Sequence, residues 1–145
     1  MQIKNRKKIL FILFLSLYSL SSNLYADEFN ITAKEILLDK ANKIITGKGT
    51  VEAIDSDGNI IIADTIIYKQ LEEFLLAEGN VKITDIEGNI ILSKKASYDK
   101  INEIIITYES TNLVLKNGSK ISSKNIYFNT NKKILTSNNI CHTKN

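Results

Sequence analysis

A segment of about 30 residues recurs through the sequence, and this repeat limits the possible folds more than any other feature. Residues 60–89 (IIIADTIIYKQLEEFLLAEGNVKITDIEGN) are followed by residues 90–119 (IILSKKASYDKINEIIITYESTNLVLKNGS). A glycine turn recurs at 57–59, 87–89 and 117–119, and a second polar turn at 39–43, 69–73, 99–103 and 129–133. A fixed period of this size indicates a repeat architecture, in which neighbouring units bury each other's apolar faces.

Within each unit the spacing of apolar residues predicts β-strands. Apolar and polar residues alternate, as in Lys82-Ile83-Thr84, and the runs are rich in Ile, Val, Thr and Tyr. Residues 35–45 have a helix-like spacing, but their place in the repeat favours strand–turn–strand. Gly49 and Gly79 stand in the middle of long strands, where we expect a bend or bulge. The sequence therefore predicts an all-β chain of four strand–turn–strand units.

One face of these predicted strands is apolar throughout. In the second unit this face contains Ile61, Ala63 and Ile67, and on the return strand Leu75 and Val81. The opposite face mixes charged residues with isoleucines. We expect the first face to be the interior, because successive side chains of a strand point to opposite sides of a sheet.

The first 26 residues differ from the rest and have the layout of a secretory signal peptide. Four basic residues precede an apolar run at 9–20, which is followed by Ser21-Ser22-Asn23. The run is shorter than the roughly 20 apolar residues of a membrane helix, so we expect cleavage after Ala26, with an uncleaved anchor as the alternative. This leaves residues 27–145 as one domain. The only cysteine, Cys141, rules out both a lipoprotein at the cleavage site and an internal disulfide.

Charge is distributed unevenly once the leader is set aside. Residues 27–93 hold 6 Lys against 13 acidic residues, whereas residues 94–145 hold 9 Lys against 3 acidic residues. The basic pI of the whole chain belongs to the leader, so it gives no reason to expect nucleic acid binding. An acidic front and a basic back could let copies or partners meet head to tail. A simple solvated surface is the preferred interpretation.

These repeats resemble the OstA-like repeat of the lipopolysaccharide-transport family, which includes LptA, LptC and the periplasmic N-terminal domain of LptD. The matching residues in the second unit are Ile61-Ile62-Ala63-Asp64, Tyr68, Glu78-Gly79-Asn80-Val81, Asp85 and Gly88. Looser matches recur at Ala33, at 49–51 and 55–58, and at Ser93, Tyr98 and Gly118. Together they cover nearly all of residues 27–145.

The resemblance implies a fold, a ligand and partners. The fold is an open, twisted β-jellyroll, in which an apolar groove between two sheets shields the acyl chains of lipopolysaccharide from water. Other proteins of the bridge to the outer membrane would add to its exposed strand edges. The protein would be periplasmic, meet membranes only through partners, and use no catalytic residue, metal or cofactor. The implied lining of the groove is Ile31, Ala33, Ile45, Val51, Ile61, Ala63, Ile67, Leu75, Ala77, Val81, Ile83, Ile91, Ile105, Leu113, Leu115 and Ile121.

Other interpretations remain open at this stage. A structural β-repeat protein, such as a spacer or adhesin, would have a closed core of the same composition and no lipid ligand. The chain is short for a stand-alone bridge protein and is compatible with the front part of a longer one. Residues 55–59 (DSDGN) begin like a calcium loop but fit a hairpin turn better. The aromatic series Tyr68, Tyr98 and Phe128 indicates packing, with sugar stacking as the alternative. The Cys141-His142 pair is interpreted as part of the chain end.

Overall fold

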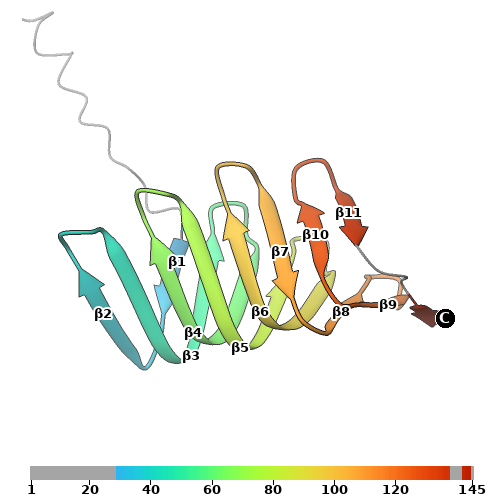
Figure 1. Ribbon diagram of the computed structural model, residues 1–145, viewed down its shortest axis with the longest axis horizontal. Coiled ribbons are helices and arrows are strands. Elements are labelled where there is room, and N and C mark those ends of the chain that lie inside the picture. Colours follow the sequence, from blue (N-terminus) through green and yellow to red (C-terminus); the bar gives the residue numbers. More distant parts are fainter. Residues whose placement is uncertain (1–28, 138–141, 145) are drawn as a thin grey trace, which may run out of the picture.

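The computed structural model describes residues 29–137 and 142–144, so the predicted leader and Cys141 lie outside the described residues. The described part consists of strands joined by turns and bends (Figure 1), and contains no helix that could span a bilayer. The strands are β1 (Phe29–Thr32), β2 (Glu35–Asp39), β3 (Ile44–Asp55), β4 (Ile60–Lys69), β5 (Phe74–Thr84), β6 (Ile90–Asp99), β7 (Ile104–Tyr108), β8 (Thr111–Val114), β9 (Lys120–Ser123), β10 (Ile126–Asn129), β11 (Ile134–Ser137) and β12 (His142–Lys144).

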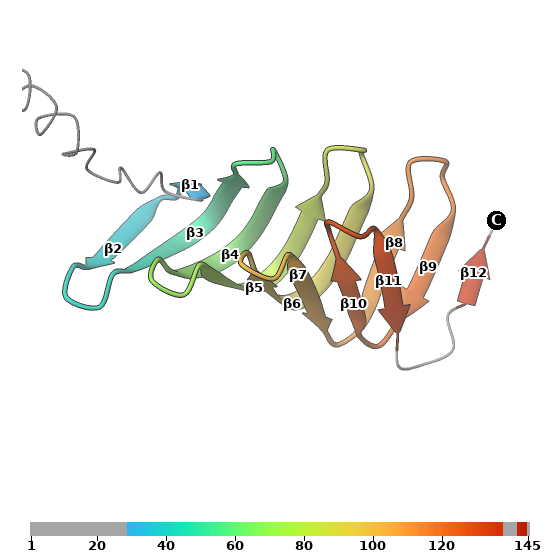
Figure 2. The ribbon, with the colours of Figure 1, turned by 90° about the horizontal axis from the view of Figure 1, so that it is seen from above.

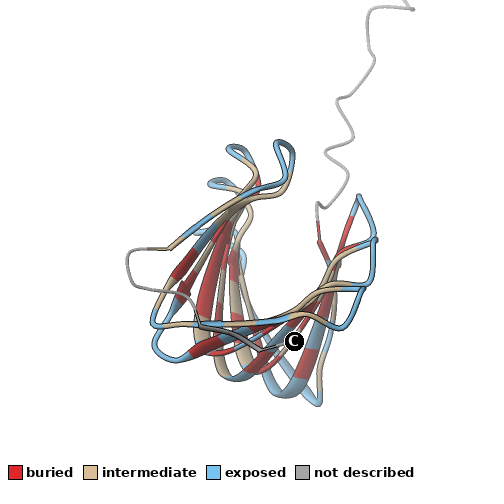
Figure 3. Cartoon of the chain, turned by 90° about the vertical axis from the view of Figure 1, so that its right-hand side faces the viewer, coloured by how far each residue is buried: buried red, intermediate tan, exposed pale blue. Residues whose placement is uncertain are grey.

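All strand pairs are antiparallel, and the four predicted units follow one another along the long axis of the molecule (Figure 2). The main path of the sheet is β1-β3-β4-β5-β6-β7-β10-β11. Strands β3 to β6 each bend near their middle and so contribute to two walls. The first wall contains β2, β7, β10 and β11, and the second wall contains β1, β8, β9 and β12. Seen end-on, the walls form a trough that is open along one side (Figure 3).

The bends arise at β-bulges that contain a glycine. Strand β3 has one residue more than β4 between Lys48 and Val51, and β5 has one more than its neighbours between Glu78 and Val81. Gly49 and Gly79 have φ angles of 79° and 78°, which residues that carry a Cβ rarely adopt. A Cβ at Gly79 would also collide with the Asp64 side chain. The predicted bend at these glycines is therefore confirmed.

The third unit makes the same bend without glycine. Glu109 and Ser110 have φ angles of 63° and 21°, and the strand is interrupted there, between β7 and β8. Hydroxyl groups organise the interruption. Thr111 donates to Thr107 Oγ1 (2.7 Å), which also accepts the backbone N–H of Ile126 (2.9 Å). Side-chain hydrogen bonds thus stabilise a backbone that glycine stabilises in the earlier units.

The first two glycine turns, taken over their full lengths of 55–59 and 85–89, are each closed by an aspartate at their first position. Asp55 Oδ1 accepts the backbone N–H groups of Asp57 and Asn59 at 3.0 and 2.8 Å, and Oδ2 accepts Asn59 Nδ2 at 2.7 Å. Asp85 repeats this pattern one unit later with Glu87 and Asn89. Because both carboxylate oxygens are engaged within the turn, residues 55–59 form a hairpin turn, as predicted.

The polar turns along the rim of the first wall bond to one another in series. The backbone N–H of Gln70 donates to the Lys43 carbonyl at 3.0 Å, and that of Lys100 to the Glu73 carbonyl at 3.0 Å. The N–H of Thr130 donates in the same way to the Glu103 carbonyl at 2.9 Å. Each unit therefore attaches to the preceding one through the same bond, as expected of a repeat array.

Candidate functional site: the interior of the trough

Most of the predicted interior residues do lie inside the trough. Ten of the sixteen are buried, and Ile31, Ala33, Ile45, Leu115 and Ile121 are partly buried against them. The ten are Val51, Ile61, Ala63, Leu75, Ala77, Val81, Ile83, Ile91, Ile105 and Leu113.

Ile67 is the exception, and the expectation that it faces the interior is wrong. Its neighbours Ile66 and Tyr68 are buried, at 0% and 1% exposure, so Ile67 points to the opposite face. The cause is the bulge. The extra residue in β5 shifts its pairing with β4 between Ile62 and Thr65, and the inward phase of β4 changes from odd to even positions.

The trough is filled with side chains near its N-terminal end. Phe29 packs edge-on against Tyr68, with ring centroids 4.9 Å apart, and against Tyr98 at 5.8 Å. We call these three rings the aromatic plug. Val51 and Ala53 of β3 and Ile61 of β4 are fully buried. This closed half is a packed core, and Tyr68 and Tyr98 are packing residues, as predicted.

An ionic cluster around the buried Lys100, which we call the clasp, joins the rims of the two walls. Its members are Lys100, Glu103 and Tyr98 from the first wall and Asp55 and Asp57 from the glycine turn of the second. The Lys100 side chain is only 5% exposed; its Nζ donates to Glu103 Oε1 at 2.7 Å, pairs with Asp57, and lies 3.8 Å from Asp55 Oδ2. Tyr98 Oη lies 3.2 Å from Asp55 Oδ2 and 2.8 Å from Glu103 Oε2.

Lys100 and Glu103 of the clasp keep their charges although burial disfavours them. Burial alone would lower the pKa of Lys100, but its bonds to Asp57 and Glu103 outweigh that cost and raise the pKa above its usual value. Burial would likewise raise the pKa of Glu103, and hydrogen bonds from Lys100, Thr130 and Tyr98 reverse the effect and lower it. Burial, together with the bond to Glu103, raises the pKa of Tyr98. At neutral pH Lys100 and Glu103 are thus charged, and Tyr98 is neutral.

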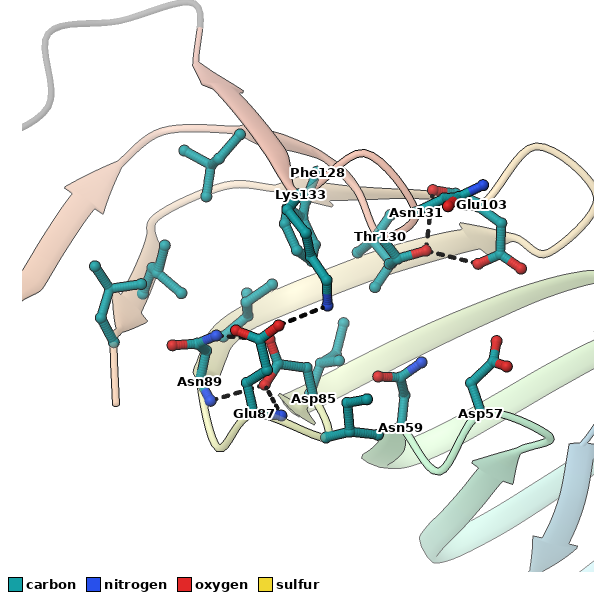
Figure 4. Close-up of a pocket in the computed structure, with 17 residues that line it drawn as sticks. Asp57, Asn59, Asp85, Glu87, Asn89, Glu103, Phe128, Thr130, Asn131 and Lys133 are labelled. Atoms are coloured by element: carbon teal, nitrogen blue, oxygen red, sulfur yellow. Dashed lines mark hydrogen bonds and ion pairs between the residues drawn. The ribbon is translucent and has the colours of Figure 1, made fainter. Parts of the chain in front are cut away.

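Beyond the clasp, toward the C-terminal end, the trough opens into a cavity of about 630 Å³ (Figure 4). Apolar side chains from both walls form its interior: Ile83, Ile91, Ile105, Leu113, Leu115, Phe128 and Leu135. Polar residues surround its mouth, and Lys133 there pairs with Glu87 at 3.1 Å (Figure 4). This open half has the size and the apolar interior of a small-molecule site.

A second, shallower hollow of about 400 Å³ lies at the N-terminal end of the trough. It is lined by residues of β1, β2 and β3, including Phe29, Ile31 and Ile45. Ile36 and Leu38 of β2 also line it and are 45% and 60% exposed. Phe29 lines this hollow and packs into the plug, so the plug separates the hollow from the open half.

Sequence reasoning missed the residues that divide and border the trough. Lys100 and Lys133 occur in polar turns whose composition resembles any solvated loop. A lysine in such a turn therefore does not indicate a place at the site. The sequence groups Phe128 with the packing tyrosines, yet it is half-buried and lines the cavity. Among residues 29–137 no cluster of His, Cys, Asp and Glu could hold a metal ion.

Comparisons with known proteins point to one fold. The sequence matches no protein-family profile and no curated protein. A solved structure with a similar fold is LptH from Pseudomonas aeruginosa, described as the LptA-homologous periplasmic component of the conserved lipopolysaccharide transport device. The two share 11% sequence identity at a TM-score of 0.73, over 82% of this chain and 97% of LptH. The chain thus has the open β-jellyroll fold of the LptA-homologous protein LptH, the fold that its repeats predict.

Proposed function

We propose that this protein is a periplasmic component of lipopolysaccharide transport and that it holds acyl chains in the open half of the trough. The observation that carries the proposal is the apolar cavity of about 630 Å³ between the two walls. The LptH-like fold and the signal-peptide layout of residues 1–26 support the transport role and the compartment.

The cavity requires no chemistry beyond burial. Each methylene that leaves water for an apolar surface contributes about 0.8 kcal/mol. Aliphatic walls such as Ile91 and Leu113 make no directional bond, so an acyl chain can slide along them without breaking one. The role is therefore transfer of an intact lipid, with no bond made or broken.

Within the predicted lining, the proposal now assigns lipid contact to Ile83, Ile91, Ile105, Leu113 and Leu115, which line the cavity. In the closed half, Val51, Ile61 and Val81 are at most 1% exposed and serve as core. Ile31 and Ile45 border the N-terminal hollow.

The partners of the proposal are other bridge proteins that pair with the edge strands. Strand β2 pairs with β3 on one side, and all five of its residues are exposed. Ile36, Leu37 and Leu38 present apolar side chains along it. Such a strand suits β-augmentation by a neighbouring protein, because a partner would satisfy the backbone and cover these side chains.

Site-specific photo-crosslinking in cells tests lipid contact. A benzophenone residue in place of Phe128, which lines the cavity, is expected to capture lipopolysaccharide. The same residue in place of Tyr127 is the matched control, since this adjacent aromatic side chain is 39% exposed and points to the other face. Equal capture at both positions, or none at Phe128, would contradict the proposal and favour a structural β-repeat protein without a lipid ligand.

A further inference from the structure

The charge along the rims changes sign from one end of the cavity to the other. On the second wall the glycine turn 85–89 carries Asp85 and Glu87, whereas the next turn toward the C-terminal end, 115–119, carries Lys116 and no acidic residue. On the first wall the polar turn 99–103 contains two acidic residues and one lysine, whereas the next turn, 129–133, carries Lys132 and Lys133 and no acidic residue. All three lysines are exposed.

Both basic turns contact the glycine turn 85–89. Lys133 of the first wall reaches Glu87 of the second, and the backbone N–H of Lys116 donates to Asn89 Oδ1 at 3.0 Å, two residues from Glu87. Turns from both walls thus bring lysines to the mouth of the cavity. Lys133 itself is one of the lining residues.

The carboxylates around the mouth differ in how firmly they are engaged. Asp85 accepts hydrogen bonds within its own turn on both oxygens, and Asp57 and Glu103 are held by the buried Lys100. In the Lys133–Glu87 pair both side chains are exposed, at 48% and 54%, whereas the Lys100 side chain is 5% exposed. Ion pairs this exposed contribute little to stability, so a competing anion can displace Glu87 into solvent.

We propose that Lys116, Lys132 and Lys133 form a subsite for the phosphate-bearing headgroup of an amphiphile whose acyl chains occupy the cavity. The proposal rests on the function proposed above and assigns an orientation to the ligand, with its anionic head at the C-terminal rim and its chains on Ile91 and Leu113. A phosphate presents more charge and more acceptor oxygens than Glu87, and it replaces that carboxylate as the partner of Lys133.

The test separates headgroup recognition from chain binding. The purified protein is loaded with the uncharged fluorescent probe N-phenyl-1-naphthylamine, which is displaced with either dodecyl phosphate or dodecyl maltoside. These detergents share a chain and differ in headgroup. We expect dodecyl phosphate to displace the probe at a roughly tenfold lower concentration at low salt, the preference that one to two exposed charge contacts supply. High salt is expected to abolish the difference.

Variants assign the preference to residues. Replacing Lys116, Lys132 and Lys133 together by Gln is expected to remove the preference and leave the maltoside unaffected. Glu87→Gln is expected to increase it, because the competing carboxylate is gone. The matched control replaces the exposed Lys40, Lys43 and Lys48 by Gln, which changes the net charge equally but lies at the N-terminal end of the array. This control is expected to keep the preference.

Each failure has a distinct meaning. Absence of probe binding to the wild-type protein would contradict the proposed function itself. Binding of both detergents without a headgroup preference, or an equal loss of the preference in the control variant, would overturn the subsite and leave the lipid cavity standing. Displacement of the probe by inorganic phosphate at the concentration at which dodecyl phosphate acts would also overturn it, since the subsite is proposed for an anchored headgroup.

Discussion

The closed and open halves of the trough are built from the same repeat, yet one is packed solid and the other encloses a cavity. In the closed half Phe29 fills the space between the walls, and Tyr68 and Tyr98 pack against it. In the open half the corresponding aromatic residue, Phe128, borders the cavity and is only half-buried. The repeat determines the walls, and a few side chains determine whether the space between them is filled.

The two ion pairs across the mouth follow the same division. Lys100 is buried among three carboxylates, whereas Lys133 meets one carboxylate in solvent. The first pairing is a fixed part of the fold, because the Lys100 and Asp55 side chains are 5% and 0% exposed, and either one left alone would be an uncompensated buried charge. In the second pair, Lys133 can readily exchange Glu87 for another anion. Four predictions test this contrast.

The largest effect is expected from Lys100→Ala. Removing the lysine leaves Asp55 and Glu103 without their cation, which should lower the free energy of unfolding by about 3 to 5 kcal/mol. Lys133→Ala, the matched change in the exposed pair, should cost less than about 1 kcal/mol. Urea unfolding followed by circular dichroism measures both. Similar losses in the two variants would mean that the clasp and the exposed pair do not differ.

Phe29→Ala removes the ring that plugs the trough. Loss of a buried phenylalanine should cost about 3 kcal/mol and connect the N-terminal hollow to the open cavity. We expect the variant to bind more molecules of the naphthylamine probe than wild type, as counted by fluorescence titration. Phe29→Leu, which keeps most of the apolar volume, should retain the wild-type stoichiometry. An unchanged stoichiometry in Phe29→Ala would show that another residue divides the trough.

Glu109→Gly tests the bend that lacks a glycine. Glycine adopts the positive φ of position 109 without strain, so we expect a gain of about 0.5 to 1 kcal/mol in thermal or urea unfolding. Gly79→Ala at the equivalent bend of the second unit should lose at least as much. Glu109→Ala, which removes the side chain but keeps the Cβ, is the control. If it stabilised as much as Glu109→Gly, the effect would come from the side chain and not from the backbone.

The smallest effect is the pH dependence of the clasp. Folding lowers the pKa of Glu103. The contribution of Glu103 to stability is therefore present above its ordinary pKa of 4.5 and is lost as the pH falls through the lower folded-state pKa. For Lys100 the pKa is raised, so its contribution is complete below its ordinary value of 10.5 and is lost only above it. We expect this contribution to be flat from about pH 5 to 10 and to decline in acid. Glu103→Gln should decline less; an identical acid profile would place the titrating group elsewhere.

Much of the fold can be predicted from the sequence because local signals and the repeat agree. Alternation, the Asx-type turns at Asp55 and Asp85, and the glycines at 49 and 79 each indicate the structure that forms. The residues of β4 that face inward were harder to predict, because bulges in the neighbouring strands β3 and β5 shift them by one position. A signal existed, however, since Asp64 and Thr65 interrupt the apolar run opposite Gly79. Continuing the in-and-out alternation of side chains past Asp64 and Thr65 wrongly placed Ile67 on the inner face.

The division of the trough could not be predicted in the same way. Filling and lining residues share one composition, and Ile61 and Ile91 look alike in the sequence although only the second borders a cavity. What separates them is the contact of Phe29 with Tyr68 and Tyr98, and of Lys100 with Asp57, which lies 43 residues away. A repeat reports what adjacent units have in common, whereas these contacts are particular to single positions.

That separation in sequence has a kinetic consequence. Neighbouring units form through short-range contacts, so the array can fold from any unit outward. The clasp requires the first three units to be in place before Lys100 of the third can meet Asp55 and Asp57 of the first. It should therefore be among the last contacts to form and the first to break. Weakening it would then accelerate unfolding and leave the folding rate nearly unchanged. The clasp would thus set the lifetime of the folded protein.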